Sequence, residues 1–354
     1  MTRKIINAYI PIALMVSFFL IAGLKAYAGP GGRNTWEFLN LTSSARVASL
    51  GGKNISLRDG DLNMVFHNPS LLDSTMHNHL VLNYVNYFAD INYGYASWAY
   101  NTKNRGTFSA GIHYINYGKF TEADRSGIIT GNFSANENSL NFSWAKAVGN
   151  YFSTGATLKI INSTFEQYKS SGAALDAGIN YYNPGNYFSA SLVIKNLGTQ
   201  ITSWYSGAEK EPLPFELQLG MTKQLAHAPL RFSLVYQHLQ EFNLDRNKPA
   251  AEDDQPHDNS FFSKLETIGN EMLRHIVVGA EFIPTPAFSL HAGYNNLRRY
   301  ELKIDDKASL AGLSWGFGIR IDRFRLGFAQ ARYHLGGSSN HFSVTTNLSG
   351  FYAN

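Results

Sequence analysis

Residues 152–160 read Phe-Ser-Thr-Gly-Ala-Thr-Leu-Lys-Ile, so apolar residues alternate with polar or small ones along this segment. Successive side chains of a β-strand point to opposite faces of a sheet. In a strand, Phe152, Leu158 and Ile160 would share one face, and the polar side chains would share the other. Such a strand has one face against an apolar environment and one face against water.

The same alternation recurs along the chain from about residue 79 to the C-terminus. Residues 188–195 and 313–320 are two further clear examples, with apolar residues at every second position. Most segments have the roughly 9–11 residues that a strand needs to cross a bilayer at a tilt. We predict fourteen strands, at approximately residues 79–88, 91–101, 106–117, 137–148, 151–161, 173–182, 187–197, 214–224, 229–239, 274–283, 287–295, 308–321, 323–334 and 340–352.

The connections between these segments fall into two classes that alternate along the chain. Those after even-numbered strands have four residues or fewer, whereas those after odd-numbered strands have up to 34 residues. Bacterial outer-membrane barrels combine short periplasmic turns with long external loops. The last segment ends near Phe351 and Tyr352, which suits pairing with the first strand to close the sheet. The sequence therefore predicts an all-β fold, a 14-stranded antiparallel transmembrane β-barrel over residues 79–354; a soluble β architecture is the alternative.

Composition supports a folded β-protein and excludes several other classes. Charged residues make up 16% of the 354 residues, aromatic residues make up 14%, and the mean hydropathy is -0.21. A helical membrane protein would be far more apolar, because each spanning helix needs about 20 apolar residues. A disordered chain would contain fewer aromatic residues. The absence of cysteine excludes disulfides, thiolate metal sites and a lipid anchor on an N-terminal cysteine.

The first 28 residues have the pattern of a secretory signal peptide. Arg3 and Lys4 precede an apolar stretch over residues 5–24, and Ala26-Tyr27-Ala28 supplies a small-x-small cleavage site. We expect cleavage after this site and export to the outer membrane of a Gram-negative bacterium. An uncleaved membrane anchor is the alternative, because the apolar stretch is long. Cleavage would remove three cations and lower the net charge from +4 to +1, which argues against a nucleic-acid partner.

Two stretches fall outside the alternating pattern. Residues 29–78 are rich in turn residues and lack sustained alternation, and residues 240–273 form the longest predicted external loop, with eight acidic and three basic residues. Within that loop, Asp258-Asn259-Ser260 can cap a helix, and apolar residues then recur at helical spacing. We predict a short amphipathic helix on the outer surface that docks a partner, or alternatively packs over the barrel mouth. The candidate docking residues are Phe261, Phe262, Leu265 and Ile268.

Charged residues on the polar faces of the predicted strands are candidates for contacts inside the barrel. They would either pair with one another and rigidify the lumen, or form a polar gate or a contact for a plug. They are Arg320, Arg323 and Arg325 around one tight turn, and Asp176, Glu216 and Glu281 elsewhere.

Enzymatic chemistry has little support in the sequence. Ser143 and Lys146 have the spacing of an acyl-enzyme pair, but in a strand residues three apart point to opposite faces. His77 and His79 could share a face of a strand, yet no third metal ligand accompanies them. We therefore predict a protein without catalytic residues, metal or cofactor.

Three short motifs, in this order, resemble the PorV/PorQ family of outer-membrane proteins, which are relatives of the FadL fatty-acid transporters. Residues 45–52 read Ala-Arg-Val-Ala-Ser-Leu-Gly-Gly, residues 68–72 read Asn-Pro-Ser-Leu-Leu, and residues 195–200 read Lys-Asn-Leu-Gly-Thr-Gln. The similarity extends over essentially the whole chain after the signal peptide. Ser70 departs from the alanine that the family usually has at this position.

The resemblance implies a plug inside the barrel over residues 29–78, with Asn68, Pro69 and Ser70 forming a rigid turn that leads toward the wall. Gly155 and Gly178, on inward faces, would let such a plug approach the wall closely. It also implies a role in the attachment complex of the type IX secretion system, together with PorU and PorV. There the barrel would anchor a PorZ-like surface protein, in contact with outer-membrane lipid and lipopolysaccharide. A FadL-like transporter of hydrophobic small molecules is the alternative.

Overall fold

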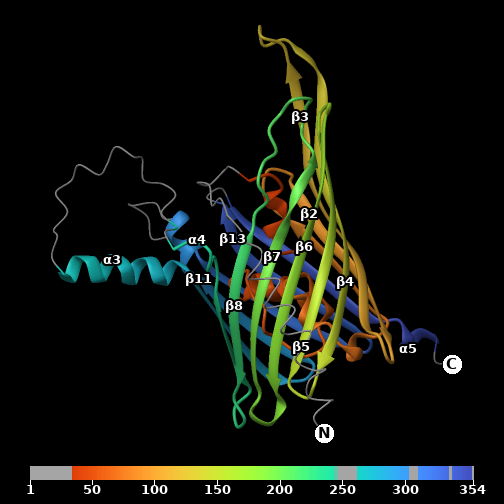
Figure 1. The fold of residues 1–354 in the computed structure, drawn as a ribbon, viewed down its shortest axis with the longest axis vertical. Coiled ribbons are helices and arrows are strands. Elements are labelled where there is room, and N and C mark those ends of the chain that lie inside the picture. Colours follow the sequence, from red (N-terminus) through yellow and green to blue (C-terminus); the bar gives the residue numbers. More distant parts are fainter. Residues whose placement is uncertain (1–33, 243, 245–260, 303–309, 335–336, 353–354) are drawn as a thin grey trace, which may run out of the picture.

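The chain folds into one closed antiparallel β-barrel in which the first and last strands pair with each other (Figure 1). The computed structural model describes residues 34–242, 244, 261–302, 310–334 and 337–352, so the predicted signal peptide lies outside the described residues. The barrel has fourteen strands, each bonded to its two neighbours in the ring. The prediction of a closed 14-stranded antiparallel barrel is therefore confirmed.

The strands vary between 7 and 20 residues, and the longest are β3 and β4. In order they are β1 (His79–Asn86), β2 (Asn92–Thr102), β3 (Gly106–Ala123), β4 (Ile129–Val148), β5 (Phe152–Phe165), β6 (Tyr168–Asn183), β7 (Phe188–Thr202), β8 (Glu216–Gln224), β9 (Leu230–Tyr236), β10 (Ile276–Thr285), β11 (Phe288–Asn295), β12 (Leu313–Ile321), β13 (Phe324–His334) and β14 (Gly337–Asn347).

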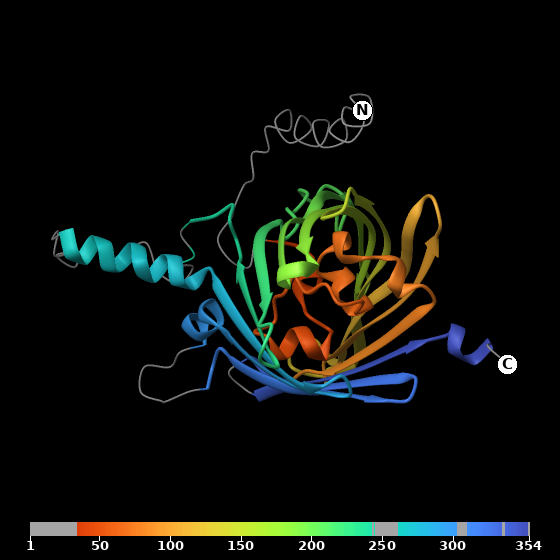
Figure 2. The same cartoon turned by 90° about the horizontal axis from the view of Figure 1, so that it is seen from below.

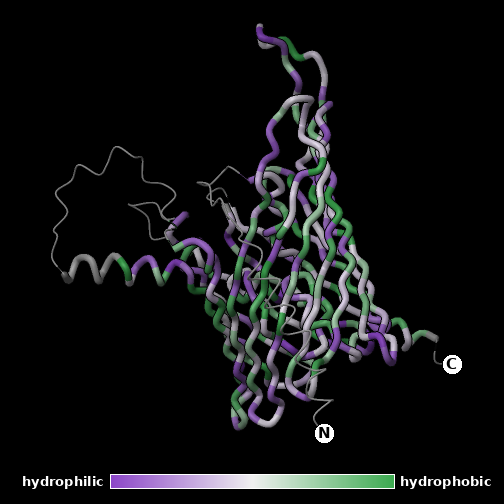
Figure 3. The backbone as a smooth tube through the Cα atoms, viewed as in Figure 1, coloured by the Kyte–Doolittle hydropathy of each residue, from purple (hydrophilic) through white to green (hydrophobic). Residues whose placement is uncertain are grey.

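The outer surface of the barrel is apolar because the alternating side chains separate by face. On β5, Leu158 is 48% exposed on the outside, whereas its neighbours Thr157 and Lys159 are buried inside. The same alternation of exposed apolar and buried polar residues recurs on β4, β6 and β7, and the hydropathy colouring alternates along the wall strands (Figure 3). No helix among the described residues is both long enough and apolar enough to cross a membrane.

The two ends of the barrel differ in their connections, as expected from the loop lengths. At one end, which we call the short-turn end, the connections are 103–105, 149–151, 184–187, 225–229, 286–287 and 322–323. At the other, the long-loop end, the connections include 203–215, 237–275 and 296–312. In outer-membrane barrels the short turns face the periplasm and the long loops face the exterior.

The predicted loop over residues 118–136 is wrong, because most of it extends β3 and β4. Lys119 pairs with Ser134 and Phe120 pairs with Phe133 beyond an irregularity in the ladder, and the two phenyl rings stack with centroids 5.1 Å apart. These cross-strand contacts continue the hairpin past the membrane-length segment that alternation alone predicts. The hairpin rises well above the rest of the barrel (Figure 1).

The predicted boundaries of the twelfth and fourteenth strands are also wrong. Helix α4 (Asn296–Glu301), capped by the Asn295 side chain, follows β11, and β12 begins only at Leu313. At the C-terminus, β14 stops at Asn347, whose side-chain oxygen accepts a hydrogen bond from the Ser349 amide at 2.9 Å. This local bond favours the turn into α5 (Ser349–Tyr352) over further strand.

Residues 34–78, which we call the plug, lie inside the barrel (Figure 2). Their apolar side chains pack on inward-facing wall residues; Phe38 and Leu39, for example, share a buried cluster with Tyr93 and Ile161. The plug consists of turns and five short helices, η1 (Glu37–Asn40), α2 (Ala45–Ser49), η2 (Leu62–Phe66), η3 (Pro69–Leu71) and η4 (Ser74–Met76).

The longest connection, residues 237–275, carries helix α3 (Phe261–Arg274), which projects sideways from the barrel (Figures 1 and 2). Residues 243 and 245–260 of this connection lie outside the described residues. Among the candidate docking residues, Ile268 is 44% exposed. Phe261, Phe262 and Leu265 belong to the helix, but their side chains lie outside what the structure describes.

Candidate functional site

Arg46 of the plug lies at the centre of a network of ion pairs. Its helix, α2, begins after Ser44, whose hydroxyl accepts a hydrogen bond from the helix backbone as an N-cap. Helix α2 directs the Arg46 side chain toward the short-turn end, where Asp59, Asp61 and Glu281 surround it. The N–O distances from its guanidinium to these carboxylates are 2.7 Å for Asp59, 3.1 Å for Asp61 and 2.8 Å for Glu281.

A second arginine, Arg231 of β9, closes this network from the wall. Its Nη1 atom lies 2.8 Å from Asp59 and 3.1 Å from Glu281. Asp59 from the plug and Glu281 from β10 are thus each held by two arginines, and the four side chains form a ring that crosses from plug to wall. Charge-assisted bonds of this kind are the strongest hydrogen bonds in proteins, provided both partners remain in place.

The protonation states of the plug side chains agree with this arrangement. Burial alone would raise the pKa of Asp59, but the charges of Arg46 and Arg231 outweigh it and hold the pKa well below its usual range. Burial alone would lower the pKa of Arg46, but the carboxylates around it hold the pKa above its ordinary value. Both groups therefore remain charged at neutral pH.

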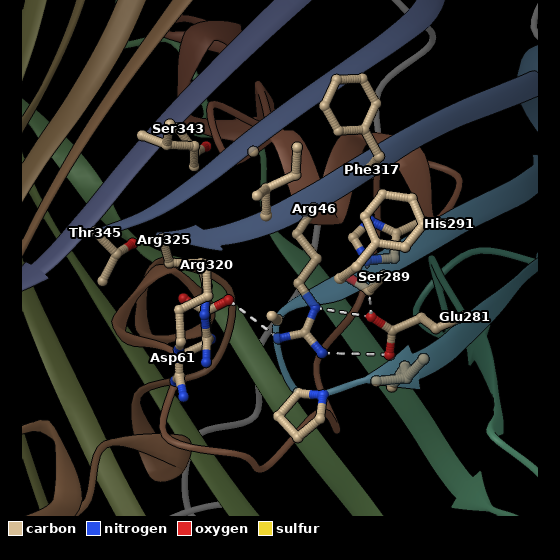
Figure 4. Close-up of a pocket in the computed structure, with 18 of the residues that line it drawn as sticks. Arg46, Asp61, Glu281, Ser289, His291, Phe317, Arg320, Arg325, Ser343 and Thr345 are labelled. Atoms are coloured by element: carbon tan, nitrogen blue, oxygen red, sulfur yellow. Dashed lines mark hydrogen bonds and ion pairs between the residues drawn. The ribbon is translucent and has the colours of Figure 1, made fainter. Parts of the chain in front are cut away.

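A cavity of about 130 Å³ adjoins this network (Figure 4). The plug contributes Arg46 and Asp61 to its lining, and the wall contributes Glu281 and His291, together with Arg320 and Arg325 from the β12–β13 hairpin. A wider recess of about 600 Å³ opens at the short-turn end, and Asp59, Arg320 and Arg325 line both spaces. We call this recess the mouth cavity.

Ser49, His291 and Glu281 are arranged in the order serine, histidine and carboxylate, as in the catalytic triad of a hydrolase. The Nδ1 atom of His291 lies 3.2 Å from the Ser49 hydroxyl, and its Nε2 atom lies 3.5 Å from the Glu281 carboxylate. However, the Ser49 hydroxyl donates its proton to the Arg46 carbonyl at 2.7 Å and has no exposed surface. The serine proton is not directed at the imidazole and no substrate can reach the oxygen, so this geometry does not make a nucleophile.

The six predicted lumen charges are not brought together in one place. Glu281 belongs to the arginine network, and Arg320 and Arg325 line the cavity beside it. Arg323 is at the turn instead, where its guanidinium lies over the Phe351 ring, 5.2 Å from the centroid. Because a two-residue turn has no strand alternation, the expectation that Arg323 faces the lumen is wrong, although it lines the rim of the mouth cavity.

Asp176 and Glu216 each take part in a separate buried ion pair. Lys159 and Asp176, on the neighbouring strands β5 and β6, lie 2.7 Å apart. Lys53 of the plug reaches Glu216 of β8 at 2.6 Å. The sequence left two alternatives for these carboxylates, pairing within the lumen or a polar gate. The structure shows both carboxylates in ion pairs within the lumen.

The Asn-Pro-Ser motif forms a compact turn against the wall. The Asn68 side chain accepts bonds from the amide and hydroxyl of Ser70, at 2.9 and 2.6 Å, and donates to the carbonyl of Ile55 at 2.7 Å. The Ser153 hydroxyl of β5 in turn donates to the Ser70 carbonyl. At Gly155, a Cβ atom would lie 2.6 Å from the Pro69 carbonyl, so only glycine allows this approach.

Several residues of the arginine network were not among those predicted from the sequence, namely Arg46, Asp59, Asp61, Arg231 and His291. Residues 59–61, Asp-Gly-Asp, have the composition of an ordinary turn. Their partner Arg46 is 13 residues away from Asp59, and Glu281 is 235 residues away from Arg46. The one available signal was Arg46 itself, a lone cation within a run of small and apolar residues.

No family model matches the sequence, and no curated protein sequence matches it either. Three solved structures share its fold at a TM-score of 0.50 and cover 86% of this chain. They are the toluene transporter TbuX of Ralstonia pickettii (13% identity, 97% of that chain covered), the toluene transporter TodX of Pseudomonas putida (11%, 96%) and a FadL homologue of Pseudomonas aeruginosa (11%, 98%). At these identities the similarity establishes the fold alone: the chain has the closed-barrel fold of the FadL-like proteins.

Proposed function

We propose that this FadL-like barrel is a non-enzymatic anchor of the PorQ type in the type IX secretion system. In this proposal it holds a PorZ-like surface protein at the cell surface, next to PorU and PorV, while secreted cargo is processed and attached. The sequence motifs over residues 45–52, 68–72 and 195–200 support this assignment, since they occur in the order found in the PorV/PorQ family.

The observation that carries the proposal is the way the plug is fastened. Arg46 joins it to β10, Lys53 joins it to β8, and the Asn68 turn packs directly on β5 and β6. A conduit would have to break several of these buried contacts in every cycle, and each broken buried ion pair costs on the order of 3 kcal/mol. An anchor requires no movement of the plug, so this fastening favours the anchor.

The long-loop end has apolar surface suited to a protein partner. The hairpins β3–β4 and β5–β6 extend there, and an open cleft of about 670 Å³ is lined by Phe165, Tyr168, Trp204 and Tyr205. Aromatic side chains contribute most of the binding energy in many protein interfaces. Helix α3 adds exposed apolar residues, including Ile268 and Met272.

A FadL-like transporter of hydrophobic small molecules is the second candidate. It is supported by the fold shared with TbuX and TodX, both described as toluene transporters. Against it, the cavity beside the arginine network is lined by charged groups such as Arg46 and Glu281. The aromatic cleft, in contrast, lies at the long-loop end, and no residue of the plug lines it.

A pull-down from detergent-solubilised outer membranes tests the proposal. We expect the tagged barrel to recover a large surface protein and sortase-complex components, and a double variant, Leu265→Asp with Ile268→Asp, to lose them. The double variant Asn150→Asp with Asn186→Asp is the matched control, because it adds the same two charges at exposed positions of two short turns, away from the long-loop end. Recovery of the barrel alone, carrying a bound hydrophobe, would favour transport instead.

A further inference from the structure

Arg320 and Arg325 lie directly opposite each other on the β12–β13 hairpin, and both side chains face the lumen. Like charges at directly opposed positions of an antiparallel pair destabilise the sheet. Among the described residues, neither guanidinium has a carboxylate within the 4.0 Å of an ion pair or a hydrogen bond to any group. Two facing cations without a partner indicate a site for an anion.

The acidic residues near these arginines already have partners. Asp59 shares the mouth cavity, but Arg46 and Arg231 hold its carboxylate at 2.7 and 2.8 Å. Asp322, at the turn, is 82% exposed and lies 3.9 Å from Arg323, so most of its carboxylate surface faces solvent. Among the described residues, Arg320 and Arg325 therefore have no ion-pair partner of their own.

The mouth cavity offers room and further donors for such an anion. Its volume is about 600 Å³, and His79, Asn347 and Ser349 contribute polar groups to its lining. Arg323 lies at the rim, against the exposed ring of Phe351. Exposed aromatic residues at a barrel end are typical of the membrane interface, where lipid headgroups lie.

We propose that the mouth cavity binds a phosphate group between Arg320 and Arg325, with Arg323 at the entrance. The planar guanidinium fork matches phosphate oxygens in pairs, and two facing forks can hold one tetrahedral group from both sides. Two sources share this chemistry, the headgroup of a phospholipid in the adjacent leaflet and free inorganic phosphate. The interfacial ring of Phe351 at the rim favours the phospholipid.

Binding to purified protein in phosphate-free, delipidated detergent micelles tests this site. Dioctanoyl phosphatidylglycerol and inorganic phosphate are the two probes, each followed by native mass spectrometry and titration calorimetry. We expect the double variant Arg320→Gln with Arg325→Gln to bind at least tenfold more weakly than the wild type. Arg105→Gln removes one cation from another short turn and is expected to leave binding unchanged.

Stability provides a second readout that does not depend on measuring affinity. Without phosphate, Arg320→Gln is expected to be more stable than the wild type, because the facing positive charges no longer repel each other. When the probe that binds is added, the wild type should become more stable than Arg320→Gln, because only the wild type retains both guanidinium groups. Binding of the lipid alone identifies a headgroup site, and binding of phosphate alone identifies a soluble ligand. Wild-type affinity in the double variant, or no binding of either probe to the wild type, would overturn the proposal.

Discussion

Arg46 of the plug and Glu281 of β10 are joined by two parallel hydrogen bonds, Nε to Oε1 at 2.8 Å and Nη2 to Oε2 at 3.3 Å. The two residues are 235 positions apart in the chain. A bidentate bond of this kind fixes orientation as well as distance. The plug therefore has one defined position against the wall, and the position can be tested by removing either partner.

Arg46→Gln is expected to destabilise the protein by about 3 kcal/mol, because it leaves the buried carboxylates of Glu281 and Asp61 without their main partner. The unfolding free energy in detergent, measured by denaturant titration with tryptophan fluorescence, gives the value. Lys103→Gln, at an exposed short turn, is the control and should change stability by less than about 0.5 kcal/mol. Equal stability of both variants would show that the network contributes nothing.

Acidification is expected to weaken the fold in two steps. Burial, together with the positive charges of Lys195 and Lys53, lowers the pKa of His67, so the unfolded chain binds a proton below about pH 6.5 that the folded chain does not. Stability from this group is complete above that pH and is lost as the pH falls, by up to about 1.4 kcal/mol per pH unit. Asp59, whose pKa is lowered by its arginines, adds stability that is lost only below about pH 4.

His67→Gln separates the two steps. Unfolding free energy measured between pH 8 and pH 5 should fall less steeply in this variant than in the wild type, because one titrating group is gone. Below about pH 4 the two proteins should lose stability in parallel, because both retain Asp59. If the unfolding free energy of His67→Gln falls with pH as steeply as that of the wild type, the first step does not come from His67.

Gly155→Ala is expected to cost about 1–3 kcal/mol, because the added methyl group would lie 2.6 Å from the backbone of Pro69 and force the plug or β5 to shift. Thermal unfolding and limited proteolysis of the plug provide the measurement. Gly337→Ala is the matched strand control, since nothing lies within 4 Å of its Cβ position. Similar behaviour of the two variants would mean that the plug is not packed on the wall at Pro69.

A disulfide between plug and wall distinguishes an anchor from a transporter. Ser56 Oγ and Thr222 Oγ1 are 2.7 Å apart, and the chain contains no cysteine, so the double cysteine variant can form only this bond. Oxidation, followed by electrophoretic mobility, should lock the plug while partner recovery in the pull-down stays at the wild-type level. Loss of partner recovery on oxidation, restored by reduction, would show that the function needs a moving plug.

The strands could be predicted from the sequence because their signal is local. Alternation such as that of residues 152–160 reports which side of a strand faces lipid, and the loop lengths report which end is which. The errors occur where another local interaction takes over. Phe120 and Phe133 prolong the β3–β4 hairpin, and the Asn347 side chain ends β14.

The candidate site could be predicted only in part, because its partners come from distant parts of the chain. Glu281 and Arg325 could be assigned to the inside from alternation alone. Their relation to Arg46 and Asp59 depends on how the plug is placed, and nothing in the periodicity of either segment specifies that placement. Arg46 belongs to one of the motifs that resemble the PorV/PorQ family, but the motif does not indicate which residues Arg46 contacts.

The pairing of β1 with β14 limits the routes by which the plug can move. A ring without a free edge offers no lateral opening, so a plug can enter or leave only through an end of the barrel. The plug runs directly into β1, at His79, so the chain segment that seals the ring also carries the plug. Once the seam is closed, the plug can leave only through an end of the barrel, and only by breaking its ion pairs to β8 and β10.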